Sequence, residues 1–130
     1  FAKEPSALFI KMSARKPSTE LKRTYKALVD TGAQISGISE ELVNDLALTK
    51  VKEVPMVDAN GNTIMRPTFK VDLIIPGSPQ EYCFLDVEVP LAGSTQGEKI
   101  LLGMNILNKG SFCFDTLEDK YIMTFKIKDI

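Results

Sequence analysis

Residues 27–33 read Ala-Leu-Val-Asp-Thr-Gly-Ala, and residues 100–107 read Ile-Leu-Leu-Gly-Met-Asn-Ile-Leu. The first segment is an apolar run that ends on the carboxylate of Asp30, which is typical of a strand that enters a core and then turns. The second is an apolar run that ends at Gly103 and continues in a short helical pattern. Asp, Thr and Gly are common turn formers, so the tripeptide alone also fits a plain turn. The context of the two segments therefore decides between a turn and a site.

The bulk composition is that of an ordinary soluble globular protein. The chain has 130 residues, 44% of them hydrophobic and 25% charged, which suits a single domain over residues 1–130. The net charge is −1 and Lys and Arg are scattered, so neither nucleic acid nor a membrane surface is an expected partner. No transmembrane segment or signal peptide is seen, which favours the cytoplasm or a precursor polyprotein. The start without Met fits either a trimmed chain or a piece of a longer precursor.

Several chemistries are excluded by residues that the chain lacks. It has no histidine, and its two cysteines are Cys83 and Cys113. Neither a Ser/His nor a Cys/His nucleophilic pair can form, and a His/Cys zinc site would need more ligands. We therefore expect no metal and no cofactor. Both cysteines lie in apolar, strand-like runs, which favours buried and reduced thiols, with a disulfide as the alternative.

The chain pattern is mostly β. Strands are expected at residues 7–12, Lys22–Val29, 51–57, Thr63–Ile75, 81–89, 111–115 and 121–127. Residues 13–20, 76–79, 92–98 and 117–119 are expected to form loops or turns. A helix is expected over 40–46, because Ser39 is a good N-cap and two glutamates follow in the first turn. A second short helix is expected over 104–109, with Gly110 as its C-cap.

A hairpin is expected between the strands at 51–57 and Thr63–Ile75. The connecting residues contain Asn60-Gly61, a strong signal for a type I′ turn because both of its central residues need positive φ. The turn segment as a whole consists of Asp58, Ala59, Asn60, Gly61 and Asn62.

In this order and spacing, the elements over residues 22–127 resemble the retropepsin-like aspartic proteases. An apolar strand leads into Asp-Thr-Gly, a hairpin follows where that family has its flap, and an apolar-apolar-Gly segment precedes a short helix. The resemblance implies a mostly β, single-lobe acid protease barrel with one or two short helices, active as a homodimer. It also implies that Leu101, Leu102, Gly103 and Asn105 form a structural motif behind the catalytic loop.

The resemblance further implies an aspartic endopeptidase that cleaves a peptide or polyprotein substrate. The chain has one Asp-Thr-Gly, so the site would combine Asp30 from each of two subunits. Two facing carboxylates share one proton because like charges cannot both ionise readily, and aspartic proteases are the standard example of this effect. One carboxylate would activate water while the protonated one donates to the developing oxyanion.

Other residues receive roles from the same resemblance. Thr31 would bond across the dimer axis, Gly32 would allow close backbone approach, and Ala33 would leave room for substrate. The turn at 58–62 would be a mobile flap over the substrate, with a plain surface turn as the alternative. Candidate pocket-lining residues are Met56, Val57, Ile64 and Leu91.

The chain departs from the viral members at two positions. These often have a second Asp after the Ala, paired with an Arg after the later Gly, whereas this chain has Gln34 and Met104. Both partners of the ion pair are absent, so no charge is left unpaired, and retrotransposon and cellular relatives are the better match.

Three alternatives remain open. A non-catalytic dimerisation or peptide-binding module could use the same fold, because fold does not imply function. A generic β-barrel could carry the motif by coincidence. The last strand, at residues 120–128, could be a plain edge strand with Lys126 and Lys128 as gatekeepers, or could pair with a partner's terminus.

Overall fold

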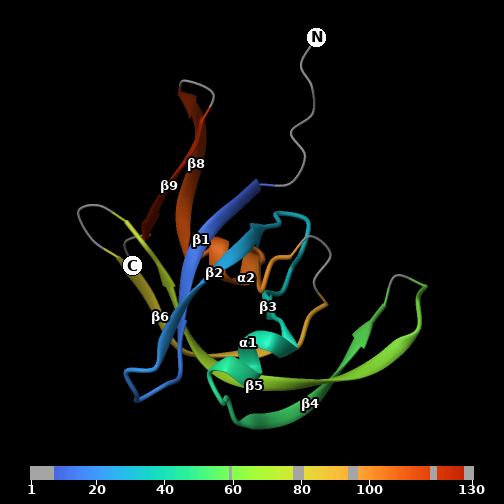
Figure 1. The fold of residues 1–130 in the computed structure, drawn as a ribbon. Coiled ribbons are helices and arrows are strands. Elements are labelled where there is room, and N and C mark those ends of the chain that lie inside the picture. Colours follow the sequence, from blue (N-terminus) through green and yellow to red (C-terminus); the bar gives the residue numbers. More distant parts are fainter. Residues whose placement is uncertain (1–7, 59, 78–80, 94–96, 118–119, 128–130) are drawn as a thin grey trace.

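The structure is a computed structural model that describes residues 8–58, 60–77, 81–93, 97–117 and 120–127, the last two strands by their backbone alone. These residues are mostly β, as the sequence predicts, with two short helices (Figure 1). The elements are β1 Leu8–Arg15, β2 Lys22–Val29, β3 Gly37–Ile38, α1 Glu40–Asp45, β4 Lys50–Val57, β5 Thr63–Ile75, β6 Tyr82–Pro90, β7 Ile100–Leu102, α2 Met104–Leu107, β8 Gly110–Leu117 and β9 Lys120–Ile127.

A seven-stranded sheet with the order β3-β7-β2-β1-β5-β4 forms most of the described fold, and β6 pairs with β5 outside this order. The long strand β5 pairs with β4 through its first half and with β1 at Asp72, Leu73 and Ile74. Along its second half β5 also pairs with β6. One strand thus joins three others, so the sheet curves around a common core.

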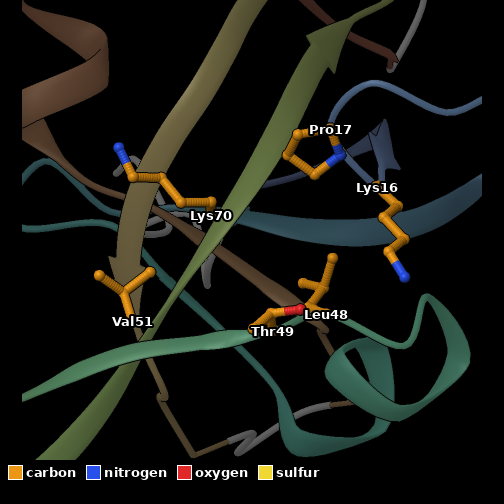
Figure 2. A pocket seen from close by; sticks show the side chains of 6 residues that line it. All are labelled: Lys16, Pro17, Leu48, Thr49, Val51 and Lys70. Carbon is orange, nitrogen blue, oxygen red and sulfur yellow. The ribbon is translucent and has the colours of Figure 1, made fainter.

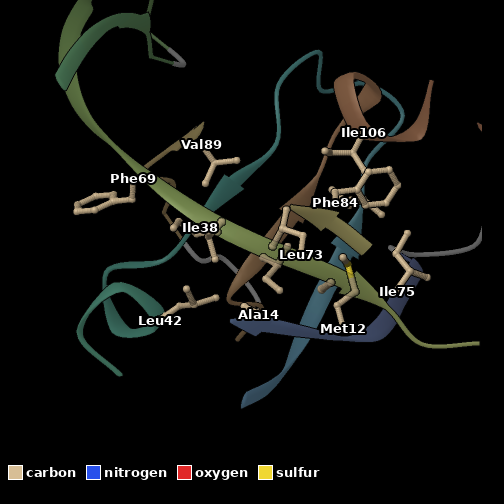
Figure 3. Close-up of a cluster of buried hydrophobic side chains, with 14 of the residues drawn as sticks. Met12, Ala14, Ile38, Leu42, Phe69, Leu73, Ile75, Phe84, Val89 and Ile106 are labelled. Atoms are coloured by element: carbon tan, nitrogen blue, oxygen red, sulfur yellow. The ribbon is translucent and has the colours of Figure 1, made fainter. Parts of the chain in front are cut away.

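The hydrophobic core lies inside this curved sheet (Figure 3). Its members alternate along the strands, as a sheet with one buried face requires. Both helices contribute to it, α1 through Leu42 and α2 through Ile106 and Leu107. The fully buried side chains include Met12, Ile38, Leu42, Leu73, Ile100, Leu102, Ile106 and Leu107.

The first helix begins as its sequence predicts. Ser39 is the N-cap, and its Oγ accepts a hydrogen bond from the Leu42 amide at 3.2 Å. Ile38 before the cap is buried together with Val43, as a hydrophobic staple requires. The helix ends at Asp45, with Leu46 as its C-cap.

Several element boundaries differ from the sequence-based prediction, most of them by one or two residues. Strand β1 continues to Arg15, through residues expected to be a loop, because Ser13, Ala14 and Arg15 pair with both β2 and β5. Helix α2 is shorter than expected: Asn108 is its C-cap. Gly110 already starts β8, so its prediction as a C-cap is wrong.

The prediction of two buried thiols is wrong for Cys83, which is a free and exposed cysteine on β6. Alternation explains this, since the neighbouring Phe84 takes the buried side of the strand. The side chain of Cys113 lies outside the described residues.

Strands β8 and β9 form a separate two-stranded antiparallel sheet. Figure 1 shows that this hairpin projects from the rest of the fold. Pairing of β9 with a partner's terminus stays a prediction. Neither helix in the described ranges is long and apolar enough to cross a membrane.

Candidate active site

Asp30 lies directly after β2, where the strand leaves the core. Its backbone amide donates to the Leu102 carbonyl at 3.0 Å, which extends the parallel pairing of β2 with β7 by one step. Its half-buried carboxylate accepts a hydrogen bond through Oδ1 from the Gly32 amide at 2.9 Å. The Ala33 amide donates to the Asp30 carbonyl at 3.2 Å. The turn therefore holds the carboxylate in one orientation.

The strand β7 passes between the two ends of the Asp30 loop. It pairs in parallel with β2 on one side and antiparallel with β3 on the other, while residues 30–36 connect β2 to β3 around it. The motif predicted at Leu101, Leu102 and Gly103 thus lies behind the Asp30 loop. Buried Leu102 also fixes this strand in the core.

Gly103 is the point where the second motif and the Asp30 loop come closest. A Cβ atom built on Gly103 would lie 2.7 Å from the carbonyl carbon and oxygen of Ile35, and 3.0 Å from the Ala33 oxygen. These are backbone atoms that cannot move aside cheaply. Only glycine fits here, and the reason is space, because φ at this position is −97°.

The start of α2 then fastens the loop. The Met104 amide donates to the Ala33 carbonyl at 2.8 Å, and the Asn105 amide donates to the Gln34 carbonyl at 3.1 Å. Gln34 and Met104, the positions that depart from the viral pattern, thus lie on the two segments that these hydrogen bonds join, Gln34 bonded by Asn105 and Met104 bonded to Ala33.

Ser36 also joins the Asp30 loop to Gly103 and Asn105, and the sequence analysis did not predict this role. Its amide and its Oγ both donate to Asn105 Oδ1, at 2.9 and 2.7 Å, and its Oγ accepts from the Gly103 amide at 2.9 Å. Ser36 is 1% exposed. A buried hydroxyl needs partners, but those partners are distant in sequence, so nothing local distinguished Ser36 from a loop serine.

Thr31 and Gly32 are exposed beside Asp30, and Ala33 is half-buried. Within the described chain the Thr31 hydroxyl makes no hydrogen bond. A Cβ on Gly32 would lie 3.3 Å from Asp30 Oδ1. The loop therefore presents its carboxylate and one unused hydroxyl at the surface.

The hairpin of β4 and β5 extends away from the body of the molecule (Figure 1). At its tip, Asp58 Oδ1 accepts from the amides of Asn60 and Asn62, each at 2.9 Å. The Gly61 amide donates to the Asp58 carbonyl, and Gly61 has φ +81°. The turn bond thus spans Asp58 to Gly61, so the predicted type I′ turn centred on Asn60 and Gly61 is wrong. Ala59 lies outside the described residues.

The candidate pocket-lining residues fall in different places. Met56 and Ile64 are cross-strand partners in the hairpin and are half-buried. Val57 points to the opposite face and is 70% exposed. Leu91 lies near the base of the hairpin, where its amide donates to the Pro67 carbonyl.

A cavity of about 280 Å³ lies elsewhere, between the β1–β2 turn and the start of β4 (Figure 2). It shares no lining residue with the Asp30 loop. Figure 2 shows that the ammonium nitrogens of Lys16 and Lys70 point away from it. Its lining consists of Lys16, Pro17, Leu48, Thr49, Val51 and Lys70.

The match to a family model agrees with the resemblance. The model of a family described as gag-polyprotein putative aspartyl protease matches residues 21–109, more than half of the chain, and the chain belongs to this family. The predicted retropepsin-like family is thereby confirmed. A retropepsin-like aspartic protease from Rickettsia conorii, known from a crystal structure, is 17% identical over 93% of this chain and 94% of that one, with a TM-score of 0.47. No curated protein matches.

Proposed function

We propose that the chain is an aspartic endopeptidase whose active form is a homodimer. The observation that carries this proposal is the Asp30 carboxylate, oriented by the Gly32 amide on a loop that β7 and α2 hold in place. One chain supplies one Asp-Thr-Gly. A two-fold symmetric dimer brings the same surface of both copies together, so it would bring Asp30 to face Asp30.

The two carboxylates would divide the work by sharing one proton. The ionised one removes a proton from water as the water oxygen attacks the peptide carbonyl carbon. The protonated carboxyl donates its proton to the carbonyl oxygen. The product of these two transfers is a neutral tetrahedral intermediate. When the C–N bond breaks, a proton passes to the leaving amine. The Thr31 hydroxyl makes no hydrogen bond to the described residues and lies beside this site, which suits a hydrogen bond to the partner's loop.

The substrate would be a polypeptide bound in extended form between the Asp30 loop and the β4–β5 hairpin. Asp58, Asn60, Gly61 and Asn62 would form the tip of this flap. Ile35 supports an apolar contact with the substrate, since it is 51% exposed and follows the Asp30 turn directly.

The experiment is cleavage of a diverse peptide mixture over roughly pH 4 to 7, the range in which a dyad holding one proton works. Wild type is compared with Asp30→Asn, and Asp86→Asn is the matched control because its side chain is 64% exposed on β6. Cleavage by wild type and by Asp86→Asn, together with no cleavage by Asp30→Asn, supports the mechanism. Cleavage retained in Asp30→Asn contradicts it. A dimer that cleaves nothing favours the non-catalytic binding module.

A further inference from the structure

The β1–β2 hairpin carries an unusual concentration of positive charge. Residues 8–29 contain six Lys or Arg and one Glu, a net charge of +5. The whole chain has a net charge of −1, so the remaining residues carry −6. The six cations lie in one continuous segment, which folds into a single two-stranded ribbon and its turn.

Strand register aligns four of the six cations in two like-charged pairs on the outer face of the hairpin. Lys11 lies directly opposite Lys26, and Arg15 lies directly opposite Lys22. Like charges directly across a sheet are destabilising. Ser13 and Thr24 lie between the two pairs and share a hydrogen bond of 3.2 Å.

The ion pairing of Lys11 and Lys22 differs from that of most lysines elsewhere in the described chain, Lys109 excepted. Lys50, Lys52, Lys70 and Lys99 each lie within salt-bridge distance of a carboxylate. On the hairpin, Arg15 does so through Asp72 at 2.9 Å. Among the described residues, Lys11 and Lys22 contact no carboxylate. Their charge is neither neutralised within the fold nor favourable to it.

A groove of about 540 Å³ crosses this ribbon, and both strands line it. Its lining combines ammonium, hydroxyl and apolar groups. The lining residues are Phe9, Ile10, Lys11, Thr24, Tyr25 and Lys26. Like charges placed directly opposite each other do not benefit the fold, and such an exception is expected where a surface has a function.

We propose that this face of the β1–β2 hairpin binds an acidic segment of another polypeptide. Charge complementarity selects an anion, and two features favour a polypeptide over single-stranded nucleic acid. Lys26 Nζ lies 4.0 Å from the centre of the Phe9 ring and occupies a face that a base would stack on. Arg15, which could fork around a phosphate, is already bound to Asp72. This binding surface shares no residue with the Asp30 loop and does not depend on catalysis.

The test uses the full chain with Asp30→Asn, so that no peptide is cut. Binding is measured by fluorescence anisotropy at low ionic strength with a labelled peptide in which Glu alternates with Ser. A basic peptide of equal length and oligouridylate are the comparison probes. The acidic peptide should bind most tightly, and its affinity should fall as salt is added.

The deciding variant is Lys11→Glu with Lys22→Glu, which should weaken acidic-peptide binding about tenfold or more. The same variant should melt at a higher temperature than the parent, because each new Glu faces a cation across the ribbon. That rise separates lost binding from lost folding. The matched control, Lys50→Glu with Lys109→Glu, makes an equal charge change off the hairpin and should leave binding within about twofold.

Three results would overturn the proposal. They are failure of the acidic peptide to bind at low salt, binding of oligouridylate as tight as that of the peptide, and equal weakening of binding by the two variants. The first result would mean that this surface does not bind acidic peptides. The second would mean that it binds nucleic acid equally well. The third would mean that binding depends only on the net charge of the protein.

Discussion

Ser36 and Asn105 act at the residue scale by joining the Asp30 loop to α2. Removing the Ser36 hydroxyl leaves the Gly103 amide without its acceptor in a buried place. We expect Ser36→Ala to lower the free energy of unfolding by about 1–3 kcal/mol. We also expect it to lower kcat more than it raises KM, because the loop that orients Asp30 loosens.

Chemical denaturation and peptide-cleavage kinetics measure these two effects. Ser13→Ala is the matched control, since Ser13 bonds another hydroxyl on the outer face of the β1–β2 hairpin. It should change stability by less than about 0.5 kcal/mol. Equal losses in the two variants would show that Ser36 does not position the loop.

Gly103 gives a second prediction, based on space. Gly103→Ala places a Cβ 2.7 Å from the Ile35 backbone, so the loop or β7 must shift. We expect a loss of about 1–3 kcal/mol in the free energy of unfolding, typical of overpacking, together with loss of cleavage. Gly93→Ala is the control, because a Cβ there has nothing within 4 Å. Equal melting temperatures for Gly103→Ala and Gly93→Ala would contradict the packing argument.

At this scale the sequence predicts Asp30 and the glycine behind it, because both belong to short, continuous motifs. It does not predict Ser36. The partners of Ser36 are Gly103 and Asn105, 67 and 69 residues away in sequence, and only the passage of β7 between β2 and β3 brings them together. The sequence also predicts a buried Cys83, because its run is apolar, but the strand turns the neighbouring Phe84 inward instead.

At the scale of elements, the end of the β4–β5 hairpin extends away from the body of the molecule (Figure 1). Its tip is held by Asp58, whose carboxylate accepts from two amides of the turn. We expect Asp58→Ala to raise KM for peptide substrates several-fold while kcat changes little, because a looser flap holds substrate less well. The melting temperature should stay close to that of wild type, since the tip is far from the core.

The control for Asp58→Ala is Glu53→Gln at the base of the hairpin. Glu53 is exposed and pairs with Lys50 on the same strand. Its change should leave KM unaltered, because isolated surface ion pairs contribute little. Unchanged KM in both variants would leave the hairpin as a surface turn, the alternative that the sequence left open.

Strand and helix positions are the part of the fold that the sequence predicts best. The prediction for β2 and β5 has the same bounds as the structure, because apolar alternation and the flanking turn residues agree there. The sequence predicts too short a strand β1, because polar Ser13 and Arg15 resemble loop residues, although alternation simply turns them outward. Helix α2 is shorter than its pattern because β8 begins at Gly110.

At the scale of the molecule, Tyr25 links the sheet to α1. Its hydroxyl donates to Asp45 Oδ2 at 3.1 Å. Burial, and then this hydrogen bond, raise the pKa of Tyr25 from 10.0 to about 12. A raised folded-state pKa gives stability that is complete below pH 10 and is lost as the pH rises towards about 12.

Tyr25→Phe should therefore be less stable than wild type at neutral pH, and the difference should shrink between pH 10 and about 12. Denaturation curves of both proteins across that interval measure it. A constant difference up to pH 12 would mean that the Tyr25 hydroxyl ionises as easily in the folded chain as in the unfolded one.

The proposed dimer makes the last prediction, because each active site would need one carboxylate from each chain. Asp30→Asn keeps the shape of the loop, so it should still pair with wild type, but the mixed dimer has a single carboxylate. At a fixed wild-type concentration, added Asp30→Asn chain should lower cleavage in proportion to the wild-type dimers it replaces. An equal amount of Asp30→Asn chain that also carries Gly103→Ala should inhibit less, because its loop cannot pack against β7. Cleavage that stays constant as Asp30→Asn is added would mean that one chain alone assembles the catalytic site.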